Sequence, residues 1–342
     1  MKKTLMILLG LLLAPIPAVT AELTGAGATF PQPLYSKMFD VYYKTRGVKV
    51  NYQGIGSGGG IQQLIAKTVD FAASDAPMTT SEGEKARSEI LHIPTCLGAV
   101  VITYNLKGNP ELKLTSDMIA DIYLGKIKYW NDPRIQKLNP DVKLPKLVIT
   151  PVYRADASGT TFIFTDYLSK AVPEWKEKMG VGKSLNWPIG VGGKGNPGVT
   201  SMVQQIEGSV GYVELTYALQ NKLPTALINN KAGKFIKPNA ESASKAVGKN
   251  VPPHMKVSIT DTDSPDGYPI SSFTWILVYR DLSYLKDVNK AKELYNLLWW
   301  IIHEGQEFAT PMNYAPLPQS IISQLENNLK RLVFGNQPLW KI

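Results

Sequence analysis

One short segment of the sequence combines residue types that suit the binding of an anion. It runs from Arg154 to Thr161 and reads Arg-Ala-Asp-Ala-Ser-Gly-Thr-Thr. An apolar, β-branched run at 147–153 precedes it and predicts a buried strand. Apolar residues at helical spacing over 164–171 follow it and predict a helix. The segment is therefore expected to lead from a strand into the start of a helix, with Ser158 as its N-cap.

The start of that helix would offer hydrogen-bond donors to a negatively charged ligand. Backbone N–H groups in the first helical turn lack an acceptor within the helix, and the helix dipole places partial positive charge there. Gly159 and Thr160 occupy this turn, and Arg154 adds a full charge ahead of it. Asp156 is expected to orient the Arg154 guanidinium, because an acid that faced the anion would repel it. The alternative interpretation is an ordinary capped helix beside a surface arginine.

Two other segments share this design. The glycine-rich run at 54–60 contains Ser57, follows a predicted strand and precedes apolar residues at helical spacing. Its small residues would let a ligand approach the backbone closely. Thr29 and Phe30 follow small residues at 25–28, which are expected to form a tight loop, and they precede another predicted helix. Several helix starts of this kind suggest a single anion held between them.

Asp75 is the exception among these residues, because it brings negative charge to a site that attracts anions. It ends a predicted strand at 69–74 and lies two residues before Pro77. An ionised aspartate can only accept hydrogen bonds. Hydrogen phosphate can donate one to it, whereas sulfate, fully ionised near neutral pH, cannot. Asp75 would then admit one oxyanion and repel the other. The alternative is an aspartate that caps the turn before Pro77.

The predicted elements place these residues together. Strands alternating with helices predict a parallel, doubly wound sheet, in which ligands bind at the carboxyl ends of the strands. Thr29, Ser57 and Asp75 all fall at such ends. Two long apolar runs, at 92–104 and 269–280, predict strands that cross between two lobes. The ligand would lie in the cleft between the lobes.

Composition and charge restrict the class of protein. The 342 residues are 44% hydrophobic and 19% charged, with a formal net charge of +9, which is ordinary globular composition with a moderate basic bias. Lys2 and Lys3, an apolar run at 6–13 and small residues up to Ala21 predict a secretory signal that is cleaved before Glu22. No later stretch is long and apolar enough to span a bilayer.

Other chemistries find little support in the sequence. No nucleic-acid-binding module is recognisable, and the lysines are scattered. The spacing Gly-x-Gly-x-x-Gly at 54–59 matches a dinucleotide fingerprint, but the acid expected about 20 residues later stands at the end of the wrong strand. His92, His254 and His303 are far apart and show no metal-ligand spacing. Cys96 is the single cysteine and is expected to be a buried thiol.

Several segments together resemble the PstS family, the periplasmic phosphate-binding proteins of the bacterial phosphate-specific (Pst) ABC transporter. The matching segments occur in family order at 24–31, 54–59, 70–77, 130–133 and 154–160. The resemblance implies a type II periplasmic solute-binding fold. Each of its two lobes has a central mixed sheet flanked by helices, and two crossover strands join them. The expected division is a signal peptide at 1–21, lobe I at 22–98 and 269–342, and lobe II at 99–268.

The resemblance also implies a site and a function. Asp156 would pair with Arg154 and would not itself contact the phosphate. The residues implied to contact phosphate are Thr29, Phe30 through its backbone N–H, Ser57, Asp75, Arg154, Ser158, Gly159 and Thr160. The expected protein is a periplasmic monomer, not an enzyme, with no cofactor, metal or nucleic-acid partner. It would deliver inorganic phosphate to transmembrane permease subunits that work with a cytoplasmic ATPase.

Three alternatives stay open at this stage. The first is a receptor for another oxyanion, sulfate or molybdate, against which Asp75 argues. The second is a secreted phosphatase that holds phosphate as its product, for which no nucleophile with a neighbouring base and no metal pair is apparent. The third is a structural or adhesive exported protein, which would leave the anion-type helix starts unexplained.

Overall fold

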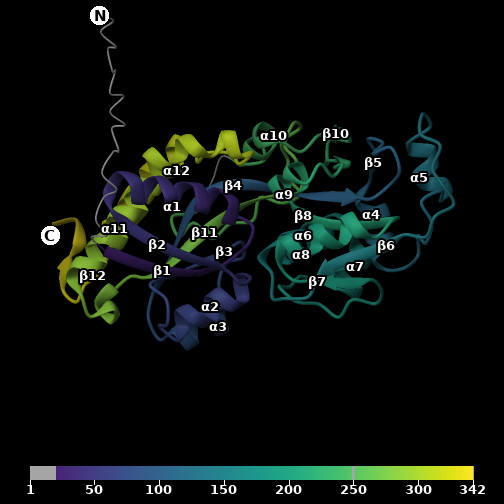
Figure 1. Cartoon of the computed structure of the whole chain (residues 1–342). Helices are drawn as coiled ribbons and strands as arrows, with labels where there is room; N and C mark the ends of the chain where they lie inside the picture. The colour runs from purple at the N-terminus through teal and green to yellow at the C-terminus, as the bar shows by residue number, and fades with distance from the viewer. Residues whose placement is uncertain (1–20, 249–250, 342) are drawn as a thin grey trace, which may run out of the picture.

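The computed structural model describes residues 21–248 and 251–341. Figure 1 shows two groups of strands and helices side by side, joined by the long strand β4 (Ile90–Tyr104), which runs from one group into the other. This arrangement confirms the predicted two-lobed α/β fold. The predicted signal segment lies outside the described residues apart from Ala21, and the predicted lobe boundaries stay predictions.

Strands of lobe I share one sheet with the first part of β4. They are β1 (Ala21–Gly27), β2 (Val48–Gly54), β3 (Phe71–Ser74) and β11 (Ser271–Tyr279). The order is β2-β1-β3-β11-β4. β1 is parallel to both β2 and β3, whereas β11 is antiparallel to β3 and to residues 90–99 of β4.

Strands of lobe II continue the ladder from the second part of β4. They are β6 (Thr150–Arg154), β7 (Val191–Gly193) and β8 (Ser209–Glu214), in the order β4-β8-β6-β7. β8 is antiparallel to residues 100–104 of β4 and parallel to β6, which is parallel to β7. The sheets are therefore mixed, as the family resemblance implied, and the purely parallel sheet expected from strand–helix alternation is wrong. β4 and β11 break the pattern because they connect the lobes instead of following a helical crossover.

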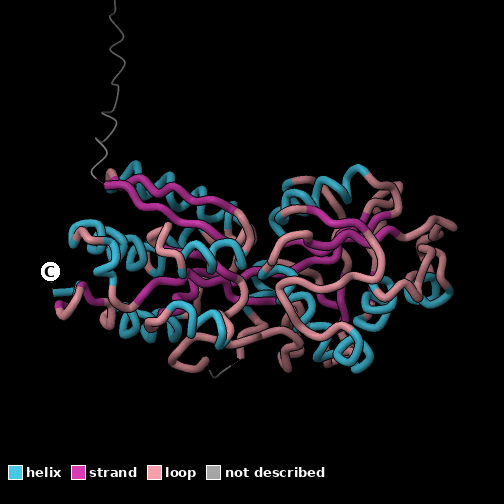
Figure 2. The backbone as a smooth tube through the Cα atoms, turned by 90° about the horizontal axis from the view of Figure 1, so that it is seen from below, coloured by secondary structure: helices cyan, strands magenta, loops and turns pink. Residues whose placement is uncertain are grey.

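Helices cover both faces of these sheets (Figure 2). The α-helices are α1 (Gln32–Arg46), α2 (Ser57–Ile65), α3 (Thr80–Ala86), α4 (Ser116–Tyr123), α5 (Pro133–Leu138), α6 (Gly159–Ala171), α7 (Pro173–Lys178), α8 (Gly195–Gln205), α9 (Leu215–Gln220), α10 (Ala240–Ser244), α11 (Val288–Ile302) and α12 (Gln319–Leu329). Short 3₁₀ turns occur at η1 (Leu282–Leu285), η2 (Glu304–Phe308), η3 (Thr310–Met312) and η4 (Leu339–Lys341). Two small sheets complete the described chain, formed by β5 (Lys113–Leu114), β9 (Leu227–Asn229) and β10 (Phe235–Ile236), and by β12 (Val333–Phe334) and β13 (Gln337–Pro338).

Two helix starts behave as their residue types predict, because serine at an N-cap and the spacing Thr-x-x-Glu both mark the beginning of a helix. The Ser158 side chain accepts a hydrogen bond from the backbone N–H of Thr161 at 3.0 Å, so Ser158 is the N-cap of α6. Thr79 and Glu82 form a capping box at the start of α3, with each side chain bonded to the other residue's N–H.

The run of small residues at 25–28 is not the predicted tight loop, because residues up to Gly27 belong to β1. This strand lies between β2 and β3 in the sheet. A Cβ atom on Gly27 would lie 2.0 Å from the carbonyl oxygen of Ala73, and one on Gly25 would enter the Phe71 ring. The small residues are needed for close packing against β3 rather than for a turn.

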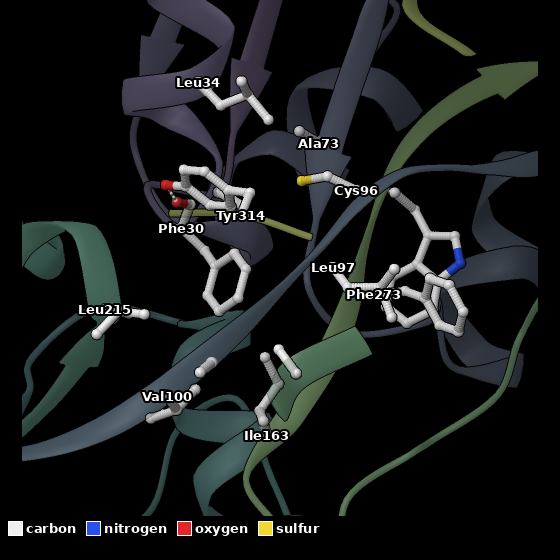
Figure 3. Packing of buried hydrophobic residues seen from close by; sticks show 14 of the residues in the cluster. Phe30, Leu34, Ala73, Cys96, Leu97, Val100, Ile163, Leu215, Phe273 and Tyr314 are labelled. Carbon is white, nitrogen blue, oxygen red and sulfur yellow. Dashed lines mark hydrogen bonds between the residues drawn. The ribbon is translucent and has the colours of Figure 1, made fainter. Parts of the chain in front are cut away.

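The hydrophobic core continues along β4 from one lobe to the other. Figure 3 shows Cys96 of β4 beside Ala73 and Leu97 beside Phe273 in lobe I, with Val100 between Leu215 and Ile163 of lobe II. Cys96 is fully buried, as predicted, and burial raises the pKa of its thiol well above the ordinary value. This thiol therefore serves as an apolar core group.

Candidate anion-binding site

The side-chain hydroxyl of Ser57 lies where three elements from both lobes meet. Its Oγ accepts hydrogen bonds from the backbone N–H of Asp75, at 3.2 Å, and of Gly159, at 3.1 Å. The starts of α2 and α6 and the end of β3 are thereby held around one atom. Nearby, the N–H of Gly58 donates to the carbonyl of Ala157 at 2.9 Å. Two of the three predicted helix starts, together with Asp75, are thereby brought into a closed contact between the lobes.

Arg154 is buried and its guanidinium is held in a fixed direction. Its Nε and Nη2 donate to the two carboxylate oxygens of Asp156 at 2.8 and 2.6 Å, a bidentate pair. Its Nη1 donates to Oγ1 of Thr160 at 3.2 Å. Partial burial alone would raise the pKa of Asp156, but the hydrogen bonds from Arg154 and from the N–H of Gly195 hold it below the ordinary value. The structure thus places Asp156 behind Arg154, where it orients the guanidinium.

Thr29 and Phe30 of lobe I, which directly precede the start of α1, also lie at the site. Thr29 Oγ1 accepts hydrogen bonds from Asn196, and the Thr29 carbonyl accepts one from the Tyr217 hydroxyl at 2.6 Å. The Phe30 ring is buried in the core at an edge-to-face angle to Tyr314, whose hydroxyl donates to the Phe30 carbonyl at 2.7 Å (Figure 3). With its ring in the core, Phe30 can serve a ligand only through its backbone.

Asp75 is 1% exposed and lies against the start of α6. A Cβ atom on Gly159 would be 2.6 Å from Asp75 Oδ2, while Oδ1 accepts a hydrogen bond from the Thr274 hydroxyl at 2.7 Å. Burial raises the pKa of Asp75 to about 7, although Thr274, Arg154 and Ser57 act in the opposite direction. The turn before Pro77 is capped by Ser74, whose Oγ accepts the N–H of Ala76. This arrangement argues against a capping role for Asp75.

Sequence reasoning missed several residues that support this site. The glycine- and proline-rich stretch at 180–198 is typical of a surface loop, yet Asn196 within it, at the start of α8, is fully buried. Glu214, at the end of β8, is a second buried acid, and burial raises its pKa to about 8, opposed by bonds from Thr216 and Tyr314. An acid directly after an apolar strand repeats the pattern that singled out Asp75. That signal would have found Glu214.

The backbone at Gly159 is packed too tightly to accept a side chain. A Cβ atom there would be 2.4 Å from Ser57 Oγ as well as 2.6 Å from Asp75 Oδ2. We expect Gly159→Ala to lower the free energy of unfolding by about 1–3 kcal/mol through overpacking. Chemical denaturation would measure it, with Gly83→Ala as control, because a Cβ on Gly83 meets no atom within 4 Å. Equal stability of both variants would contradict the close packing.

Metal-ligating clusters and membrane-spanning helices are both absent from the described residues. Within residues 21–248 and 251–341, no cluster of three or more His, Cys, Asp or Glu side chains could hold a metal ion. Over the same residues, no helix has both the length and the apolar character to cross a bilayer. A cavity of about 920 Å³ lies elsewhere, beside Lys170, Lys231 and Asp263.

Comparison with known proteins identifies the family. The model of the PBP superfamily domain matches residues 14–302. A protein of Pasteurella multocida, "Phosphate-binding protein PstS", is 43% identical over 329 residues, which cover 93% of each chain. A protein of Methanocaldococcus jannaschii with the same name is 42% identical over 320 residues, covering 86% of this chain and 82% of the relative. This chain belongs to the PstS family.

Solved structures agree with the fold expected of the PstS family. A high-affinity periplasmic phosphate-binding protein, solved with bound phosphate, has a TM-score of 0.74 at 20% identity and covers 92% of this chain and 99% of its own. A phosphate-binding protein from Stenotrophomonas maltophilia has a TM-score of 0.69 at 18% identity, with coverage of 90% and 93%. At these identities the likeness concerns the fold alone.

Proposed function

We propose that this protein captures inorganic phosphate in the periplasm and delivers it to the transmembrane subunits of an ABC transporter. The observation that carries the proposal is that two buried charged side chains, Arg154 and Asp75, both lie near the start of α6. The Arg154 guanidinium is held in a fixed direction by Asp156. Arg154 supplies the charge that an oxyanion needs, while Asp75 requires a hydrogen on that oxyanion. Membership of the PstS family, whose relatives are named for phosphate binding, supports the same conclusion.

The proposed contacts come from both lobes. Asp156 would act on the anion only by holding Arg154 in place. The phosphate ligands in this proposal are Thr29, Phe30 through its backbone N–H, Ser57, Asp75, Arg154, Ser158, Gly159 and Thr160. Charge-assisted hydrogen bonds are roughly twice as strong as neutral ones and would offset the loss of hydration. We assign the first four to lobe I, at 22–98 and 269–342, and the other four to lobe II, at 99–268.

Capture would proceed by closure of the lobes over the ligand. The hydrogen bond of Gly58 to Ala157 joins the lobes in the closed form, and the Gly159 N–H, which donates to Ser57 Oγ without a ligand, would turn to the anion when it is bound. An ion pair between Lys183 and Glu82 adds a further contact. The closed lobes bury the anion and present a surface that a permease can distinguish from the open form. The mature protein would begin at Glu22 and act as a monomer.

The direct test is a titration of the purified mature chain with phosphate, followed by tryptophan fluorescence and by calorimetry. We expect saturable binding of one phosphate per chain, and competition in which sulfate displaces it only at much higher concentration. Absence of phosphate binding at millimolar concentration would refute the proposal. Displacement by sulfate at comparable concentration would instead favour a general oxyanion receptor. Hydrolysis of a phosphomonoester by the same preparation would favour the phosphatase alternative.

A further inference from the structure

Asn196 joins the two lobes at the centre of the proposed site. Its side chain is fully buried at the start of α8 in lobe II. The amide Nδ2 donates to Oγ1 of Thr29 at 2.9 Å and to Oγ1 of Thr160 at 3.1 Å. Thr29 belongs to lobe I and Thr160 to lobe II, so both hydrogens of one amide group are used on hydroxyls from opposite lobes.

The orientation of this amide is fixed by its other end. The backbone N–H of Glu214 donates to Asn196 Oδ1 at 2.9 Å. A reversed amide would set its –NH₂ group against that N–H, which would place two donors face to face. The Thr200 hydroxyl also donates to the Asn196 carbonyl at 2.9 Å and holds the backbone. The –NH₂ group of Asn196 must therefore point toward the two threonines.

This geometry decides what the threonine hydroxyls can do. A hydroxyl oxygen has two acceptor positions and one hydrogen to donate. Thr29 Oγ1 accepts from both the backbone N–H and the side chain of Asn196, and Thr160 Oγ1 accepts from Asn196 and from Arg154. The acceptor positions of both oxygens are filled. Among the hydrogen bonds formed within residues 21–248 and 251–341, none gives either hydroxyl hydrogen an acceptor. Both hydrogens remain available for the oxygens of a ligand.

We propose that Asn196 is a positioning residue of the phosphate site, which sets the hydroxyls of Thr29 and Thr160 as donors toward the anion when the lobes close. The inference rests on the proposed capture of phosphate and deepens it. Asn196 touches no ligand atom in this scheme and acts through the two hydroxyls. Because the same amide bridges the lobes, the donors are aligned only in the closed form. An oxyanion, whose oxygens accept hydrogen bonds, is thereby favoured over ligands that present donors at these positions.

The first experiment measures phosphate affinity by calorimetry in the wild type and in Asn196→Ala and Asn196→Asp. We expect affinity to fall roughly 10–100-fold in Asn196→Ala, since the hydroxyls are then free to turn away. Asn196→Asp keeps the side-chain size but should bind more weakly still, because its carboxylate accepts the hydroxyl hydrogens and repels the anion. The control is Asn230→Ala, since Asn230 is similarly buried, bonds to Pro265 and lies outside the site. It should bind phosphate as the wild type does.

A double-mutant cycle separates positioning from a merely structural role. The Asn196→Ala change is repeated in a Thr160→Val background, where one of its two hydroxyl targets is absent. We expect the affinity loss caused by Asn196→Ala to shrink at least about threefold in that background. An equal loss in both backgrounds, or wild-type affinity in a folded Asn196→Ala protein, overturns the inference. Thermal unfolding verifies that each variant is folded. If Asn196→Ala does not fold, Asn196→Asp replaces it in the double-mutant cycle with Thr160→Val. Failure of the wild type to bind phosphate would instead refute the proposed function.

Discussion

Arg154→Ala should abolish tight phosphate binding, with a loss in affinity of about 10²- to 10⁴-fold. The variant removes the buried cation of the site and leaves the carboxylate of Asp156, which is mostly buried, without its bidentate partner. Removing one partner of a buried pair costs about 3–5 kcal/mol, and each tenfold change in affinity corresponds to about 1.4 kcal/mol. Calorimetric titration with phosphate measures the loss.

Two further variants test whether the loss in phosphate affinity is caused by removal of the Arg154 guanidinium. Arg154→Lys keeps the charge but cannot form the planar fork with Asp156, so we expect an intermediate affinity. Arg134→Ala removes an arginine that pairs with Asp121 and Asp132 and is about half exposed, outside the site. It should bind phosphate like the wild type. If Arg154→Ala bound phosphate as tightly as Arg134→Ala, the proposed site would be wrong.

Asp75→Asn should remove most of the discrimination between phosphate and sulfate. In the wild type, sulfate can be bound only while Asp75 is protonated, and burial sets the pKa of Asp75 at about 7. Sulfate affinity should therefore fall about tenfold for each pH unit above this value, whereas phosphate can donate its own hydrogen to the ionised carboxylate. An asparagine amide donates to either anion at any pH. Competition binding between pH 5 and 9 should give a flat sulfate profile for Asp75→Asn.

The same substitution should change the stability of the ligand-free protein in a pH-dependent way. Because the pKa of Asp75 is raised on folding, the folded state keeps its proton to higher pH than the unfolded state does. The stability that the protonated form provides is complete below the ordinary pKa of 3.8 and is lost as pH rises to about 7. Asp75→Asn should thus be more stable than the wild type at pH 8 by ~2–4 kcal/mol, with little difference at pH 4. Denaturant unfolding at both pH values measures this.

Asp70→Asn is the matched control for both measurements. Asp70 is also a buried lobe I aspartate, but it accepts from the N–H of Thr24 and pairs with Lys290 away from the site. Its substitution should leave the sulfate profile unchanged and should not stabilise the protein at pH 8. A wild-type sulfate profile in Asp75→Asn would remove the proton-acceptor role that we assign to Asp75.

The parts of the site that depend on local chain chemistry were accessible from the sequence. The Ser158 cap of α6 and the Thr79–Glu82 capping box each use atoms three residues apart. The order of predicted strands and helices placed Ser57 and Asp75 at the ends of strands. It did not predict that β4 and β11 are antiparallel neighbours, which only the structure shows. Local spacing encodes caps and helix faces, but it does not encode which strands become neighbours.

The parts that depend on distant contacts were not accessible. The last three residues of β1, 25–27, are glycine and alanine, which have low strand propensity, and they are in the strand because β2 and β3 pair with them on either side. Asn196 meets Thr29 across 167 residues of sequence, so nothing beside Asn196 in the chain indicates its partner. Buried hydrogen-bond networks of this kind become visible only when the lobes are placed together.

The change of partners along β4 has a consequence for how the molecule can open. Residues up to Ala99 are bonded to β11, and residues from Val100 onward are bonded to β8. A bend of the backbone between those two residues would swing one half of the protein away from the other while both ladders keep their pairing. Opening would then break the polar contacts around Ser57 and Thr29 and the ion pair between Lys183 and Glu82, while the hydrogen bonds within each ladder are kept.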